Sequence, residues 1–187
     1  MGRRPPDPPY PARSATGRGG RVSGGLELRS LAPADFAEAR MVADAWFGHP
    51  VGLTMHRLFF DQLGPSGLRA ADPRDPDRMI GVLLGFASLA EPELAYIHFV
   101  MVDPQARERG VARALYEEFG RRMFAAGCIR VRTLAAPQRA RSIKFHEALG
   151  FVGEFASEYL GPGQDRVVFE RELPLAPDPG AETSRGS

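Results

Sequence analysis

Hydrophobic positions change their spacing repeatedly between residues 26 and 173, and each change marks the boundary of a predicted element. Short apolar runs predict strands at 26–29, 67–71, 79–89, 94–102, 129–134, 151–159 and 166–173. Apolar residues at helical spacing predict helices at 33–46, 51–63, 109–126 and 139–149. Pro33 suits the first turn of its helix, and Asp35 suits the positive end of the helix dipole.

The order of these elements predicts the fold class. The turn-rich segment 72–77 separates two strands that we expect to form a hairpin, and a strand–helix–strand succession follows from 94 to 134. A hairpin that leads into such a crossover builds a mixed sheet. We therefore expect an α/β fold with helices on both faces of the sheet.

The most informative stretch runs from 96 to 115. Its strand stops at Asp103-Pro104, and the apolar pattern resumes at helical spacing from Val111. The start of a helix leaves backbone N–H groups without partners, and their partial charge adds to the helix dipole. Because Gly110 lets an anion approach the backbone closely, this turn is suited to a pyrophosphate.

Two sequence blocks together resemble a known family. The first has the spacing Arg-x-x-Gly-x-Ala, with Arg107, Gly110 and Ala112, and the second runs from 142 to 151 and ends in Ala-Leu-Gly-Phe. In this order they resemble the GNAT superfamily of acyl-CoA-dependent N-acetyltransferases over about residues 26–173. The segments 46–48, 58–60 and 96–100 are similar to a bacterial subgroup whose substrate is unassigned.

The resemblance implies acetyl-CoA as co-substrate and a mostly antiparallel sheet in which two central parallel strands, 94–102 and 129–134, splay apart. The pantetheine arm of the cofactor would lie between them. Backbone contacts to pantetheine are implied for Val100, Met101 and Val102. The pyrophosphate loop implied by the motif consists of Arg107, Glu108, Arg109, Gly110, Val111, Ala112 and Arg113. Arg139 stands where the family usually has an asparagine, so it would instead reach a phosphate or face solvent.

Transfer of an acetyl group to an amine needs a base that takes a proton from the amine. His98 is our candidate, because it lies two residues beyond the position that resembles the glutamate base of some family members. Its ordinary pKa near 6.5 suits the task. We expect it to share a strand face with Tyr96 and Val100. A structural histidine in a buried strand is the alternative, and Glu93 acting through water is the fallback.

His146 is the candidate proton donor to the departing sulfur, because it stands where many family members have a tyrosine. Histidine can donate as an imidazolium or through a neutral N–H group. A thiolate whose acid has a pKa near 8.5 also leaves with little help, so His146 would otherwise only orient the sulfur or pack in the core.

The acceptor site is expected opposite the cofactor, between the first two helices and the late strands. Candidates there are Trp46, His49, His56 and Tyr159. The leading hypothesis is direct attack of a primary amine, of a small molecule or a protein terminus, in a ternary complex. The alternatives are a non-catalytic acyl-CoA-sensing domain and a nucleic-acid-associated factor that uses the N-terminal arm.

Composition sets the limits of the domain. Residues 1–25 and 174–187 are rich in Gly, Pro and polar residues, so we expect a disordered arm and tail around one domain at 26–173. The arm holds five arginines and one aspartate, a charge of +4, which leaves −3 for the rest of a chain of net charge +1. An acidic body argues against nucleic acid as a partner. A homodimer is compatible with the sequence.

Other features bear on location and source. No apolar stretch is long enough to span a bilayer, and we expect a soluble, cytoplasmic protein with no membrane partner. Cys128 is the only cysteine, which excludes an intrachain disulfide, and we expect no metal. Lys144 is the only lysine, a bias that favours a bacterial source.

Overall fold

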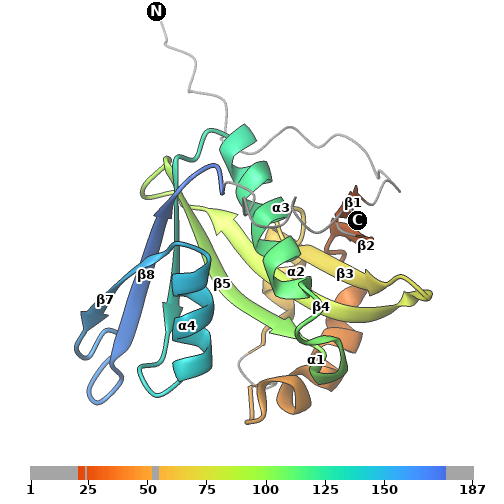
Figure 1. Cartoon of the computed structure of the whole chain (residues 1–187), viewed down its shortest axis with the longest axis horizontal. Coiled ribbons are helices and arrows are strands. Elements are labelled where there is room, and N and C mark those ends of the chain that lie inside the picture. Colours follow the sequence, from red (N-terminus) through yellow and green to blue (C-terminus); the bar gives the residue numbers. More distant parts are fainter. Residues whose placement is uncertain (1–20, 24, 52–54, 176–187) are drawn as a thin grey trace, which may run out of the picture.

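A single mixed sheet organises the chain in the computed structural model, which describes residues 21–23, 25–51 and 55–175 (Figure 1). The strands are β1 (Arg21–Ser23), β2 (Leu26–Ser30), β3 (Leu68–Asp72), β4 (Asp75–Ala87), β5 (Leu94–Val102), β6 (Arg130–Ala135), β7 (Val152–Ala156) and β8 (Arg166–Glu172). The helices are α1 (Asp35–Phe47), α2 (Arg57–Leu63), the 3-10 turn η1 (Pro104–Ala106), α3 (Val111–Ala125) and α4 (Ala140–Ala148). Strand order is β1-β2-β3-β4-β5-β6-β8-β7, and among these described strands β5 and β6 form the parallel pair.

Two apolar clusters hold helices on opposite faces of the sheet. The larger one joins Leu115 and Phe119 of α3, together with Ile143 of α4, to inward residues of the central strands. The second joins Trp46 of α1 and Phe60 of α2 to residues of β4 and β5. Alternation along the strands supplies both faces, as the hydrophobic pattern predicts for a sheet covered on two sides.

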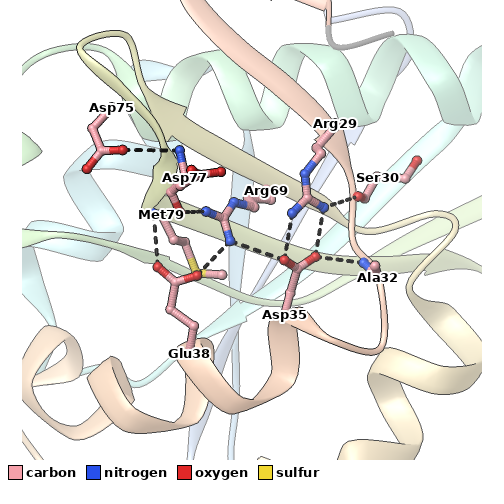
Figure 2. A network of polar contacts seen from close by, with 9 residues as sticks. All are labelled: Arg29, Ser30, Ala32, Asp35, Glu38, Arg69, Asp75, Asp77 and Met79. Atoms are coloured by element: carbon pink, nitrogen blue, oxygen red, sulfur yellow. Dashed lines mark hydrogen bonds and ion pairs between the residues drawn. The ribbon is translucent and has the colours of Figure 1, made fainter. Parts of the chain in front are cut away.

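A buried polar network fixes the start of α1 against three strands (Figure 2). Asp35, the first residue of α1, accepts the N–H of Ala32 from the preceding loop at 2.7 Å and two hydrogen bonds from Arg29, at 2.7 and 2.8 Å. Arg69, only 4% exposed, reaches Asp35 at 3.1 Å and Glu38 at 2.6 Å. The same network includes the backbone of Met79 and Asp77. The helix therefore has a set position relative to the sheet.

The predicted elements between 26 and 173 are all present, and the mixed, mostly antiparallel sheet is confirmed. Three boundaries differ from the prediction by three or more residues. Strand β4 begins at Asp75 and not at 79, because Asp75 pairs with Asp72 and the hairpin turn is shorter than the segment 72–77. The second helix begins at Arg57 because Nδ1 of His56 caps it by accepting the N–H of Leu58 at 3.1 Å. Strand β7 ends at Ala156, since the chain turns at Glu158, which has a φ of 51°.

The ends of the domain also differ from the expected limits. Residues 21–23, assigned to the arm, form β1 and pair with β2, because strand pairing uses backbone groups that a count of buriable side chains misses. Leu175, assigned to the tail, is 8% exposed and packs in the larger cluster. The rest of the expected arm and tail, 1–20 and 176–187, lies outside the described residues.

Candidate active site

The parallel pair separates partway along its length. Ladder pairing between β5 and β6 runs from Leu94 with Arg130 to Ile97 with Thr133 and extends no further along these two described strands. Beyond that point β5 continues to Val102 beside β4, while β6 continues beside β8. We call the resulting opening the notch, bounded by residues 98–102 of β5 and 134–135 of β6. An extended ligand with its own hydrogen-bonding groups can pair with such a strand edge.

A β-bulge lies at the beginning of the notch. Leu84 of β4 pairs with Phe99, and Gly85 pairs with Ile97, so His98 is the extra residue. His98 packs on Phe59 of α2, with ring centroids 5.1 Å apart, on the face opposite Ile97. The bulge therefore places His98 on the α1–α2 side where β5 leaves β6.

The bulge also overturns one expectation. Val100 packs in the cluster around α3, whereas His98 and Phe99 lie beside α2 and α1. The prediction that Val100 shares a face with His98 is wrong, because an inserted residue shifts the strict alternation on which that prediction depended.

The environment of His98 favours its neutral form. Its ring keeps an exposed edge but lies among Phe59 and Phe99, and this desolvation lowers the pKa of His98 below its ordinary value. Solvent access limits the size of that shift. Glu93, the fallback base, is exposed just before β5, five residues and about 16 Å from His98 at roughly 3.3 Å per residue, so the structure does not bring the two together.

The turn that leads into α3 has the geometry of an anion site. Glu108 and Gly110 have φ values of 66° and 78°, and space is open where a Cβ of Gly110 would project. The first helical hydrogen bond runs from the N–H of Ala114 to the carbonyl of Gly110, at 2.9 Å, so the N–H groups of Val111 and Ala112 precede it. The first turn of α3 carries no acidic residue. These groups suit a phosphate-bearing ligand.

Arginines around this turn have different surroundings. Arg107 donates through Nη2 to the carbonyl of Trp46, at the end of α1, at 2.5 Å. Glu108 lies 3.4 Å from Arg141 of α4, an exposed pair that links the turn to the neighbouring helix. Arg109 and Arg139 are exposed, the latter at the start of α4.

His146 lies inside the protein on the α3–α4 side. It is 3% exposed, its Nε2 is 2.8 Å from the hydroxyl of Tyr116, and its ring stacks on Phe169 with centroids 4.7 Å apart. Burial lowers its pKa to about 4, against a smaller opposing effect of the Ser142 backbone. Its Nδ1 is buried and forms no hydrogen bond of good geometry with the described residues, so the Ser142 carbonyl is a weak partner.

Tyr116 is a residue that sequence reasoning missed. It is 3% exposed, and burial raises its pKa, which a hydrogen bond with Thr133 partly opposes. Thr133 belongs to the last paired position before the notch. Within the sequence, Tyr116 follows Leu115 on the apolar side of a helix and is indistinguishable from a core residue.

The acceptor candidates fall into different settings. Trp46 is buried at 9%, and His56 caps α2, so both have structural roles. His49 packs beside Phe47, with ring centroids 5.8 Å apart. Tyr159 is 43% exposed in the turn between β7 and β8.

The protein has an α/β fold in which two parallel strands separate beside a helix that begins after a glycine. This arrangement suits an extended ligand that carries phosphate. The family model described as "Acetyltransferase (GNAT) family" matches residues 36–151, more than half of the chain, and the chain belongs to this family. The protein is an acetyltransferase that uses acetyl-CoA to acetylate an amine. The open turn before α3 and the unpaired edge of β5 fit that co-substrate.

Solved structures share the fold at low identity. A GNAT-family protein from Desulfovibrio desulfuricans is 19% identical, with a TM-score of 0.69, covering 81% of this chain and 99% of that one. The ribosomal-protein-S18-alanine N-acetyltransferase from Escherichia coli is 18% identical, with a TM-score of 0.64 and coverages of 82% and 97%. A phosphinothricin acetyltransferase from Sinorhizobium meliloti, in complex with AcCoA, is 22% identical, with a TM-score of 0.65 and coverages of 83% and 95%. No curated protein matches this chain significantly.

Among the described residues, no helix is both long and apolar enough to cross a membrane.

Proposed function

We propose that the protein acetylates a primary amine, of a small molecule or a protein terminus, by direct attack of that amine in a ternary complex. The observation that carries the proposal is the bulge that presents His98 where β5 leaves β6. A base at this point lies beside the unpaired strand edge along which the cofactor arm would bind. Beyond the end of β5, the turn before α3 supports a pyrophosphate site.

His98 is the proposed general base. In the reaction, the amine nitrogen forms a bond to the thioester carbonyl carbon, the carbon–sulfur bond breaks, and the amine proton passes to the imidazole. Deprotonating a lysine-like ammonium at pH 7 costs about 4 to 5 kcal/mol, whereas an α-ammonium costs about 1 to 1.5 kcal/mol. The lowered pKa of His98 keeps it neutral but makes it a weaker base, which favours acceptors with the less basic amine.

His146 is proposed to interact with the sulfur as a neutral group. With a pKa near 4 it carries no proton to give as an imidazolium at neutral pH, so a hydrogen bond is the remaining role. The raised pKa of Tyr116 keeps its hydroxyl protonated, and that hydroxyl then donates to Nε2 and leaves the proton of His146 on Nδ1. We assign Tyr116 as the residue that sets this tautomer.

The cofactor site is proposed to use backbone groups more than side-chain charge. Val100, Met101 and Val102 supply the strand edge for pantetheine, and the turn from 107 to 113 holds the pyrophosphate. Arg139, exposed at the start of α4, is placed to reach a phosphate.

Wider aspects of the proposal depend on composition. An arginine-rich chain with one lysine supports a bacterial source, and the use of acetyl-CoA supports a cytoplasmic location. We retain the homodimer as a working hypothesis.

The test combines binding with turnover. Titration of the purified protein with acetyl-CoA by calorimetry is followed by free-thiol release across a panel of amines. We expect binding and amine-dependent release, and we expect His98→Gln to lower kcat about 10²- to 10⁴-fold while acetyl-CoA affinity is unchanged. His56→Asn, which preserves a helix cap, is the matched control. Binding without release for any amine would instead support the acyl-CoA-sensing alternative.

The pH profile gives an independent readout. Because the pKa of His98 is lowered, the acid limb of kcat/KM is expected below pH 6.5 in the wild type. Loss of that limb in His98→Gln identifies the base, and an unchanged limb assigns it to another group.

A further inference from the structure

On the face of the sheet where His98 lies, α1 and α2 cover β4 and β5 but not β6 and β8. The apolar cluster under α1 and α2 draws its strand residues from β4 and β5, and of the described residues it includes none from β6, β7 or β8. An acceptor whose amine reaches His98 therefore has the surface of β6 and β8 beside it.

Most charge on this surface is already balanced. Arg130 and Arg132 alternate with the buried residues Val131 and Thr133, so they face away from α3. Both bind Glu170 of β8, at 2.9 and 2.8 Å, and both lie 3.5 Å from Glu91. The pairing with Glu170 holds the pKa of that carboxyl below its ordinary value, against the effect of burial.

Arg166 differs from these two arginines. It begins β8, on the same face as Glu170, because Val167 and Phe169 between them pack in the cluster on the other face. Its guanidinium donates to the backbone carbonyl of Asp165 at 2.7 Å. Among the described residues no carboxylate lies within ion-pair distance of it, although the side chain is half-buried. A half-buried guanidinium without a counter-charge is suited to an anion from outside.

Arg166 also lies at the level of the notch. Its neighbour Val167 pairs with Ala135, two residues past the last paired position of β5 and β6. Two tyrosines complete the surroundings. Tyr96 is two residues before His98 and pairs with Arg132. The charges of Tyr159, Arg132 and Arg166 each affect the pKa of its phenol, so these groups lie near it. Burial is the main cause that raises the pKa of Tyr96, to about 12, so its hydroxyl stays a hydrogen-bond donor.

We propose that the acceptor carries an anionic group, a carboxylate or a phosphorus oxyanion, near its amine, and that Arg166 binds this group with the hydroxyls of Tyr96 and Tyr159 beside it. This inference rests on the proposed function of the site. The acceptors would then be amino acids and similar molecules that carry both an amine and an anionic group. Polyamines are excluded, because their second positive charge would be repelled by Arg166.

The experiment compares acceptors that differ only in the anionic group. Each of a series of α-amino acids is paired with its decarboxylated amine and with its neutral amide, and kcat/KM is measured from thiol release across pH 7 to 9.5, so that differences in amine pKa are separated from recognition. We expect the amino acids to exceed their partners. In Arg166→Gln we expect KM for the amino acids to rise about 10- to 100-fold, the range for a charge-assisted hydrogen bond, with the amides and acetyl-CoA affinity unchanged.

Arg130→Gln is the matched control, because Arg130 lies on the same face but is already paired with Glu170. The inference is overturned if neutral amines or polyamines are the better acceptors, or if Arg166→Gln affects amino acids and amides equally. If neutral amines are acetylated faster than the amino acids, the proposed transferase stands and only the anion site is removed. Binding of acetyl-CoA with no release for any acceptor removes both.

Discussion

The hydroxyl of Tyr116 lies 2.8 Å from Nε2 of His146, and this contact joins α3 to α4 on the side of the sheet opposite His98. Both side chains are 3% exposed. Because Tyr116 also bonds Thr133, at the last paired position of β5 and β6, the pair lies next to the point where the strands separate. Candidate acid and base groups thus occupy opposite faces of the sheet at the notch.

We predict that Tyr116→Phe will lower kcat more than it changes acetyl-CoA affinity, because His146 loses the donor that sets its tautomer. The variant also leaves a buried nitrogen unpaired, which costs about 1 to 3 kcal/mol of unfolding free energy. Nitrogen chemical shifts of His146 report the tautomer directly: we expect the Nδ1–H form in the wild type and a mixture in the variant.

His146→Phe is expected to reduce turnover more than cofactor affinity. A double-mutant cycle with Tyr116→Phe separates the pair from its surroundings, because two partners that act together give strongly non-additive effects. Additive losses in kcat, or turnover equal to the wild type in His146→Phe, would make the pair a packing feature of the core.

Gly110→Glu is predicted to abolish acetyl-CoA binding. The residue has a φ of 78° and open space at its Cβ, so the added side chain would put negative charge into the space offered to a pyrophosphate. Gly127, at the other end of α3, has a φ of 97° and equally open space. Gly127→Glu therefore carries similar backbone strain and should bind acetyl-CoA normally by calorimetry. Unchanged affinity in a folded Gly110→Glu protein contradicts the phosphate site.

Arg107→Ala is predicted to raise KM for both acetyl-CoA and the amine, since Arg107 connects the turn before α3 to the carbonyl of Trp46 at the end of α1. Arg109, exposed in the same turn, supplies the comparison: Arg109→Ala should affect acetyl-CoA alone. Steady-state kinetics with both substrates varied distinguishes the two, and a pure acetyl-CoA effect in Arg107→Ala would show that the link to α1 carries no coupling.

The network around Asp35 predicts acid sensitivity. Burial would raise the pKa of Asp35, but hydrogen bonds from Arg29 and Ala32 and the charges of Arg29 and Arg69 outweigh it, and the pKa is lowered below 3.8. The stabilisation is therefore complete above the unfolded pKa, near 3.9, and is lost as pH falls through the lower folded value. Urea unfolding at pH 7 and between pH 4 and 2.5 measures it.

Asp35→Asn should cost about 3 to 5 kcal/mol at neutral pH, because buried Arg69 loses a counter-charge. Its deficit relative to the wild type should shrink below pH 4, as the wild-type carboxylate takes up a proton. Asp61→Asn removes an exposed pair with Arg57 and should cost less than about 0.5 kcal/mol at any pH. A deficit in Asp35→Asn that is independent of pH would rule out the ion pair as its cause.

Local patterns predicted the elements well where one face of a segment is buried. Strand β5 has the predicted limits, 94–102, and α3 lies within two residues of its own. The helix predicted at 51–63 was less accurate, because its start depends on a capping contact of His56 and not on hydrophobic spacing. The phosphate-loop residues came from the motif, and their geometry suits the role, whereas Tyr116 and Arg166 carried no local signal.

The sequence by itself determined the α/β order, the glycine-led start of α3 and the family, because these depend on periodicity and spacing along short segments. Only the tertiary structure decided which side of β5 each residue faces, since the bulge at His98 exists through its pairing with β4. It also decided that residues 30 apart, Tyr116 and His146, share a hydrogen bond. Contacts between distant segments depend on how the elements pack. The spacing of residues within one segment does not specify which other segment lies beside it.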